Sequence, residues 1–161
     1  MTIATHTTIS ALSETSVSRA FTILLHRLSD LIRLDSAGAA SGRAENREDR
    51  TDDLTRARAA VLAAAQDTLE TPAEHPLDGP LHRLATLAEL QMTLHCPEER
   101  AYIYQQVLVN HDLFEIVGVS AMDRRVGNMQ RVFFERYSTL VEGPQIADVT
   151  AEAGQFEAIP A

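Results

Sequence analysis

The amino-acid sequence predicts an all-α fold, a bundle of four or five helices with a long mobile loop after the first helix and flexible termini. Apolar residues recur at three- and four-residue spacing in five separate stretches, and most prolines and glycines fall between those stretches. No stretch alternates apolar and polar residues as a strand does, and no segment is repeated along the chain. A length of 161 residues suits one domain.

The first fifty residues divide into a tail, a helix and a loop. Residues 1–15 are rich in threonine and serine without helical spacing, which predicts a flexible N-terminal tail. Residues 16–34 are expected to form the first helix, because their apolar residues share one stripe: Val17, Phe21, Leu24, Leu25, Leu28, Leu31 and Ile32. Residues 35–53 hold many charges and no large apolar side chain. We expect a mobile loop there, because it cannot bury enough surface to offset its ordering entropy.

The middle of the chain predicts three further helices. Residues 52–70 are alanine-rich with a thin apolar stripe, and a proline-rich connector follows them. The third helix, about residues 78–95, is apolar over more than half of its circumference, which is typical of a central or interface helix. A fourth helix starts at Pro97 and is expected to reach Val117, with a break near Asn110 left open. Its two apolar sides predict burial on two faces.

The last helix is predicted over residues 120–142 with a signal at each end. Ser120 can cap the first turn while Asp123 faces the positive end of the helix dipole, and Gly143 and Pro144 stop the helix. Its apolar stripe consists of Met122, Val126, Met129, Phe133, Tyr137 and Leu140. The domain is therefore expected to span residues 16–143, and the acidic residues 144–161 are expected to be disordered.

Composition narrows the function classes. A net charge of −9 disfavours nucleic acid and anionic membranes as partners, and all 14 basic residues are arginine, which excludes lysine-nucleophile chemistry. The single cysteine fits a reducing compartment. The N-terminus does not resemble a signal peptide, and no apolar run is long enough for a membrane span. A cytoplasmic protein is expected.

The leading hypothesis is a non-enzymatic protein that works by binding another protein, as a regulator, adaptor or assembly component. The two highly apolar helices carry more apolar surface than a small monomeric bundle needs, which favours a homodimer. Phe134 lies off the main stripe of the last helix, and Gly127 on the same edge would let a second helix approach closely. The residues expected to face the partner are Arg124, Gly127, Arg131 and Phe134.

The alternatives come from other classes. His111 and Glu115 lie four residues apart on a strip shared with Tyr104, a spacing that can supply two metal ligands. His95 and Cys96 could add ligands for a metal or haem, although the ferritin-type pair of Glu-x-x-His motifs is absent from the sequence.

A small-molecule sensor with a pocket between the third and fourth helices is a further alternative. The four arginines of the last helix, Arg124, Arg125, Arg131 and Arg136, also resemble a DNA recognition helix, but the acidic chain argues against it. No cofactor is expected under the leading hypothesis.

Overall fold

A computed structural model describes residues 14–40, 47–116 and 118–142 of the chain, and these residues form an all-α bundle. No strand occurs among them. Their elements are α2 (Ser16–Ala40), α3 (Arg47–Glu70), α4 (Asp78–Thr93), α5 (Pro97–Val109), the 3₁₀ helix η2 (His111–Phe114) and α6 (Ala121–Glu142). The predicted fold class is confirmed.

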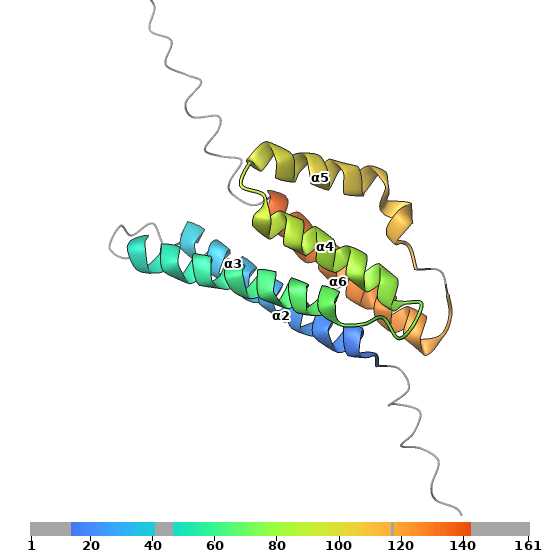
Figure 1. Cartoon of the computed structure of the whole chain (residues 1–161). Coiled ribbons are helices and arrows are strands. Elements are labelled where there is room, and N and C mark those ends of the chain that lie inside the picture. The colour runs from blue at the N-terminus through green and yellow to red at the C-terminus, as the bar shows by residue number, and fades with distance from the viewer. Residues whose placement is uncertain (1–13, 41–46, 117, 143–161) are drawn as a thin grey trace, which may run out of the picture.

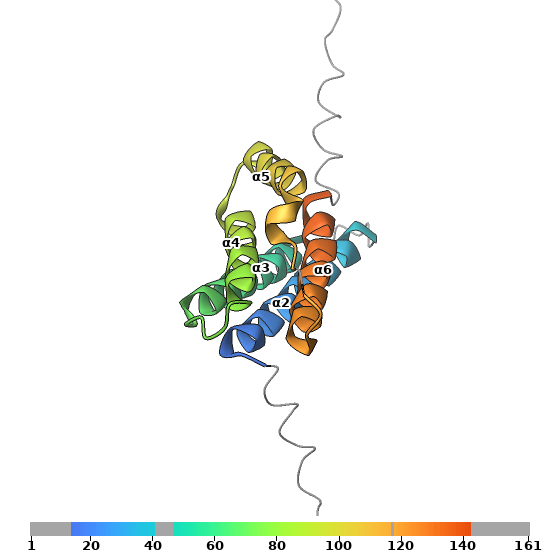
Figure 2. The same cartoon turned by 90° about the vertical axis from the view of Figure 1, so that its right-hand side faces the viewer.

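Helices α2, α3, α4 and α6 form the body of the bundle, and α5 lies on its outside. α2 and α4 pack against each other, and both pack against α3 and α6. α5 packs chiefly against α6, and it stands apart from α2 and α3 in both views of the chain (Figures 1 and 2). The prediction of a central third helix agrees with α4, but α2 is equally central. None of the helices in the described ranges is long and apolar enough to cross a membrane.

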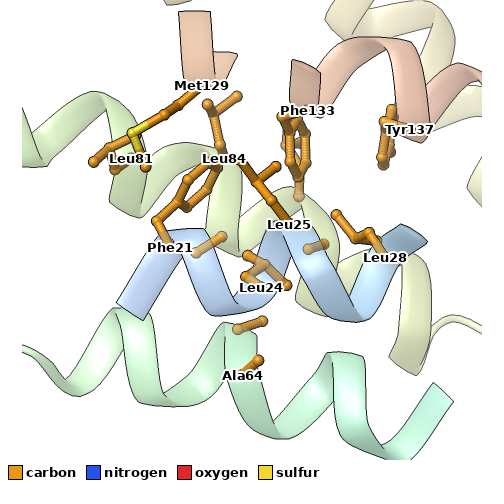
Figure 3. Packing of buried hydrophobic residues seen from close by; sticks show 14 of the residues in the cluster. Phe21, Leu24, Leu25, Leu28, Ala64, Leu81, Leu84, Met129, Phe133 and Tyr137 are labelled. Atoms are coloured by element: carbon orange, nitrogen blue, oxygen red, sulfur yellow. The ribbon is translucent and has the colours of Figure 1, made fainter. Parts of the chain in front are cut away.

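The core is built on the apolar stripe of α2, whose side chains point toward α6 on one side and toward α3 on the other (Figure 3). Phe21 and Phe133 are fully buried, and their ring centroids lie 5.8 Å apart. Phe133 also stacks on Tyr137 at 5.6 Å. These contacts fix α6 against α2, so the aromatic residues of the last helix determine which of its faces remains available.

Tyr137 carries the one polar atom of this aromatic stack. Its side chain is fully buried, and its hydroxyl finds no hydrogen-bond partner in the described part of the chain. Burial, and secondarily the nearby Tyr104, raises the pKa of Tyr137 to about 12, because ionisation would place a charge in an apolar surrounding. The phenol therefore stays neutral and acts as a core side chain.

The predicted loop of residues 35–53 is wrong at both of its ends. α2 continues to Ala40 and α3 already begins at Arg47. Three alanines in residues 37–40 favour continuation of a helix that has already nucleated, and they offset the cost of about 1 kcal/mol of Gly38 among them. On the α3 side, Asp53 pairs with Arg56 at 3.2 Å one turn later. The remaining residues, 41–46, lie outside the described part of the chain.

The predicted N-terminal tail is shorter than 15 residues. Thr15 donates a hydrogen bond to Asp78 at 2.6 Å, and Glu14 pairs with Arg125 of α6 at 2.6 Å, so both are anchored to the bundle. The predictions for residues 1–13 and 143–161 concern parts of the chain outside the described ranges.

Candidate functional site

The break at Asn110 shapes the only part of the described chain where a helix gives way to a 3₁₀ turn. The Asn110 side-chain amide donates to the carbonyl of Gln106 at 2.7 Å, and α5 ends at Val109. Asparagine favours such local bonds over continuing a helix. The fourth helix therefore ends at the break near Asn110 that the sequence left open and does not reach Val117, and η2 follows it.

The start of α6 confirms the predicted cap. The amide of Asp123 donates to the Ser120 hydroxyl at 3.1 Å, and the amide of Ser120 donates to the Asp123 carboxylate at 2.8 Å. These reciprocal bonds satisfy two amides of the first turn. The hydrogen bonds from Ser120, first its side chain and then its backbone, hold the pKa of Asp123 below its usual value.

The side chain of Phe134 on α6 holds η2 in place. Its ring lies 5.6 Å from that of Phe114, edge to face, and 5.5 Å from the imidazole of His111. It also contacts Phe133 of the core at 5.7 Å. Phe134, which lies off the main apolar stripe in the sequence, therefore makes contacts within the chain. It connects the core to η2. It is half-buried, and part of its surface remains available.

A groove of about 590 Å³ runs between α5–η2 and α6. One wall comes from α5, η2 and the residues after it: Tyr104, Val107, Leu108, His111, Glu115 and Ile116. The other wall comes from α6: Gly127, Gln130, Arg131, Phe134, Glu135 and Ser138. The surface is mainly apolar, with charged groups spaced along its length. We call it the α5–α6 groove.

The structure brings two predicted groups of residues into this groove. Three of the expected partner-facing residues, Gly127, Arg131 and Phe134, line it. The fourth, Arg124, lies outside it and donates to the carbonyl of Val119 at 2.7 Å. His111 and Glu115 line it as well, although they no longer share a helix with Tyr104.

The four candidate metal ligands do not come together. His95 and Cys96 precede α5, whereas His111 and Glu115 follow it, and 13 helical residues separate the two pairs by about 20 Å. No cluster of three or more potential ligands occurs within the described ranges. The Cys96 thiol donates to Glu98 at 2.6 Å, which lowers the pKa of that carboxyl.

Several polar groups in the groove bind polar side chains in it or beside it. Arg131 donates to Glu135 at 2.8 Å and to Asn128 at 2.7 Å, at an exposed position where such bonds contribute little stability. The Tyr104 hydroxyl donates to Glu142 at 2.9 Å, and burial, followed by that carboxylate, raises the pKa of the phenol.

Gly127 has no structural reason to be glycine within the described part of the chain. A Cβ atom added there would meet nothing within 4 Å. Glycine inside a helix costs about 0.5–1 kcal/mol relative to alanine. Nothing among the described residues packs against Gly127 to offset that cost, and Gly127 lines the groove.

The outer side of α5–η2 exposes large apolar side chains that the sequence predicted to be buried. Tyr102 is 63% exposed, Val109 75% and Leu113 64%. Tyr102 and Val109 are seven residues apart and therefore share one side of α5. Leu113 lies beyond the end of α5, on η2, and we call these three exposed residues the outer face. Of the large apolar side chains exposed in the described ranges, all but Ile23 lie between residues 102 and 119.

Sequence reasoning identified the second apolar stripe of the fourth helix but misjudged what covers it. On α5 that stripe consists of Tyr102 and Val109, and no helix of the described chain packs on it, whereas the rest of the predicted stripe lies beyond the break at Asn110. A second hollow, of about 400 Å³, lies between the end of α4, the start of α5 and the end of α6. It is close to where a ligand pocket was hypothesised.

The chain matches no protein-family model, and comparisons with curated proteins and with solved structures gave no significant match.

Proposed function

We propose that this chain is a non-enzymatic protein-binding module whose outer face on α5–η2 is covered by a protein partner in its working state. The observation that carries the proposal is that most of the exposed large apolar side chains of the described residues lie on α5 and in the segment that follows it. Complete burial of a side chain of this size stabilises by roughly 1.5–3 kcal/mol. Burial of Tyr102, Val109 and Leu113 by a partner would therefore supply enough free energy for specific binding.

The position of α5 supports the same proposal. α5 is attached to the bundle chiefly through α6, so its outer side is accessible without unfolding the core (Figure 2). The arginines Arg124 and Arg131 are exposed on α6, the helix that carries α5. The module is expected to work as a regulator, adaptor or assembly component in the cytoplasm, and a second copy of the chain is one expected partner.

The proposal is tested with the double substitution Val109→Asp/Leu113→Asp. The full-length protein is purified from its native cell after cross-linking, and the associated proteins are identified by mass spectrometry. We expect a stoichiometric partner with the wild type and at least a tenfold loss of it with the double variant, because burying two carboxylates is unfavourable. Both positions are exposed, so the helical circular dichroism should not change.

Ile23→Asp is the matched control. Ile23 is 54% exposed on α2, far along the chain from α5, and it receives the same chemical change. The control should keep the partner. A wild type that recovers no partner, or a partner that is retained equally by the double variant, would contradict the proposal.

A further inference from the structure

The exposed side chain of Tyr102 on α5 is bordered by carboxylates and neutral amides. Residues three and four positions away on a helix lie beside a given side chain. For Tyr102 these neighbours are all exposed, and they are Glu98, Glu99, Gln105 and Gln106. None of the four is basic. This part of the outer face therefore lies among acidic and neutral polar groups.

The one arginine of α5 lies on the other side of the helix. Arg100 precedes Tyr102 by two residues, so the two side chains project about 160° apart around the helix axis. Arg100 lines the hollow between the ends of α4, α5 and α6, together with Gln91 and Leu140. Its charge is thus directed toward the bundle, and the charged groups that border Tyr102 on α5 are carboxylates alone.

The carboxylates near the outer face are not neutralised by ion pairs within the chain. Glu99 on α5 and Asp112 on η2 are exposed, and neither forms an ion pair within residues 14–40, 47–116 and 118–142. α3 is also acidic but is arranged differently, because Asp53 there pairs with Arg56 at 3.2 Å. The outer face thus combines uncovered apolar surface with unpaired negative charge.

A second copy of the chain does not supply the complementary surface. Among the described helices, only α2 and α6 hold more arginines than carboxylates, and the apolar stripes of both are buried in the core. A symmetric contact between two outer faces would bring carboxylates together without a bordering basic group. The charges therefore favour a different protein as the occupant.

We propose that the protein partner covers the outer face with a basic amphipathic helix. The apolar side of that helix covers the three residues of the outer face, and its arginines or lysines lie opposite Glu99 and Asp112. The inference rests on the proposed function, because it specifies the chemistry of the partner at the same surface.

The spacing of the exposed residues suits a helix laid along α5. Tyr102 and Val109 are seven residues apart, which is two turns or about 10 Å along the axis. A helix packed alongside presents its apolar side chains with the same repeat. α5 lies on the outside of the bundle, so a second helix can approach it from solvent (Figure 2). The ring of Tyr102 can also receive an arginine or lysine by a cation–π contact.

The test measures the binding of two synthetic helical peptides to the full chain by fluorescence anisotropy. Both peptides span about three heptads with leucine at the a and d positions, and the flanking e and g positions are lysine and arginine in one and glutamate in the other. We expect the basic peptide to bind with a Kd of about 10 μM or lower and the acidic peptide at least tenfold more weakly. The affinity of the basic peptide should fall as the salt concentration rises.

Two matched charge variants show where the basic peptide binds. Glu99→Gln/Asp112→Asn removes two carboxylates near the outer face and keeps their size, so it should weaken the basic peptide by about fivefold and reduce the salt dependence. Asp67→Asn/Glu70→Gln is the control, because it neutralises two exposed carboxylates of α3. The control should change the Kd by less than about twofold. All four positions are exposed, so the helical circular dichroism should persist.

The apolar part of the contact is tested with Val109→Ser/Leu113→Ser. This variant keeps every charge and removes two apolar side chains, so it should weaken the basic peptide at least tenfold. Failure of the basic peptide to bind, equal binding of the two peptides, or equal effects of the outer-face and α3 charge variants would overturn the inference.

The natural partner separates this inference from the proposed function. In the cross-linking experiment, Glu99→Gln/Asp112→Asn should recover about fivefold less partner than the wild type. A partner lost with Val109→Asp/Leu113→Asp but recovered in full with Glu99→Gln/Asp112→Asn supports the proposed function and contradicts the basic helix. Recovery of a second copy of the chain as the partner contradicts it as well.

Discussion

Replacing Asp78 by alanine is expected to lower the free energy of unfolding by about 3 kcal/mol. The carboxylate is fully buried at the start of α4. It accepts hydrogen bonds from the Thr15 hydroxyl at 2.6 Å and from the amides of Glu74 and His75 at 2.9 Å each. Alanine leaves all three donors without their acceptor, and the start of α2 loses its connection to the segment before α4.

Urea denaturation followed by circular dichroism measures this loss. Asp78→Asn keeps one acceptor oxygen and should lose less stability than alanine. Asp67→Ala on α3 removes an exposed carboxylate and should stay within about 0.5 kcal/mol of the wild type. A stability of Asp78→Ala equal to that of the Asp67 control would show that the buried carboxylate does not join these segments.

Phe133→Ala is expected to lower the free energy of unfolding by about 3–5 kcal/mol, which is the second large effect. Phe133 is fully buried and its ring contacts those of Phe21, Phe134 and Tyr137 at centroid distances between 5.6 and 5.8 Å. Removing it leaves a cavity at the junction of α2 and α6, since the surrounding rings come from different helices and cannot all close inward.

Phe134→Ala is the matched comparison, because it makes the same change one residue later. Phe134 is only half-buried and contacts η2. Its removal should therefore lower the free energy of unfolding by roughly half as much as Phe133→Ala, and it should loosen η2 rather than the core. Hydrogen exchange of residues 111–114 reports the second effect. Equal losses from both variants would contradict the assignment of Phe133 to the core and Phe134 to the groove.

Local signals explain which elements could be predicted from the sequence. α6 was predicted correctly at its start because Ser120 and Asp123 form a reciprocal cap, and the sides of the helix were predicted correctly because its apolar period is regular. The fourth helix was expected to reach Val117 because apolar residues continue past Asn110. The hydrogen bond from the Asn110 side chain to the backbone, which ends the helix, leaves no trace in the spacing of apolar residues.

The site could be predicted only in part, for a physical reason. Gly127 and Phe134 were identified on one edge of a helix and Arg131 as a further partner-facing residue, and the structure places all three in one groove. The exposure of Tyr102 and Val109 could not be predicted, because an apolar stripe has the same pattern whether the chain itself or another molecule covers it. Leu108 was not identified, because its place in the groove depends on how α6 packs against α5.

The most direct test of the proposed function is the reactivity of Tyr102 toward nitration in the cell extract and in the dilute purified protein. Tyr102 is 63% exposed, whereas Tyr104 is 9% exposed and Tyr137 fully buried, so the two other tyrosines of the chain serve as internal references. A partner on the outer face should protect Tyr102 in the extract by about tenfold or more, with the protection lost in Val109→Asp/Leu113→Asp. Equal nitration of Tyr102 in the extract and in the purified chain would contradict the claim that this face is covered.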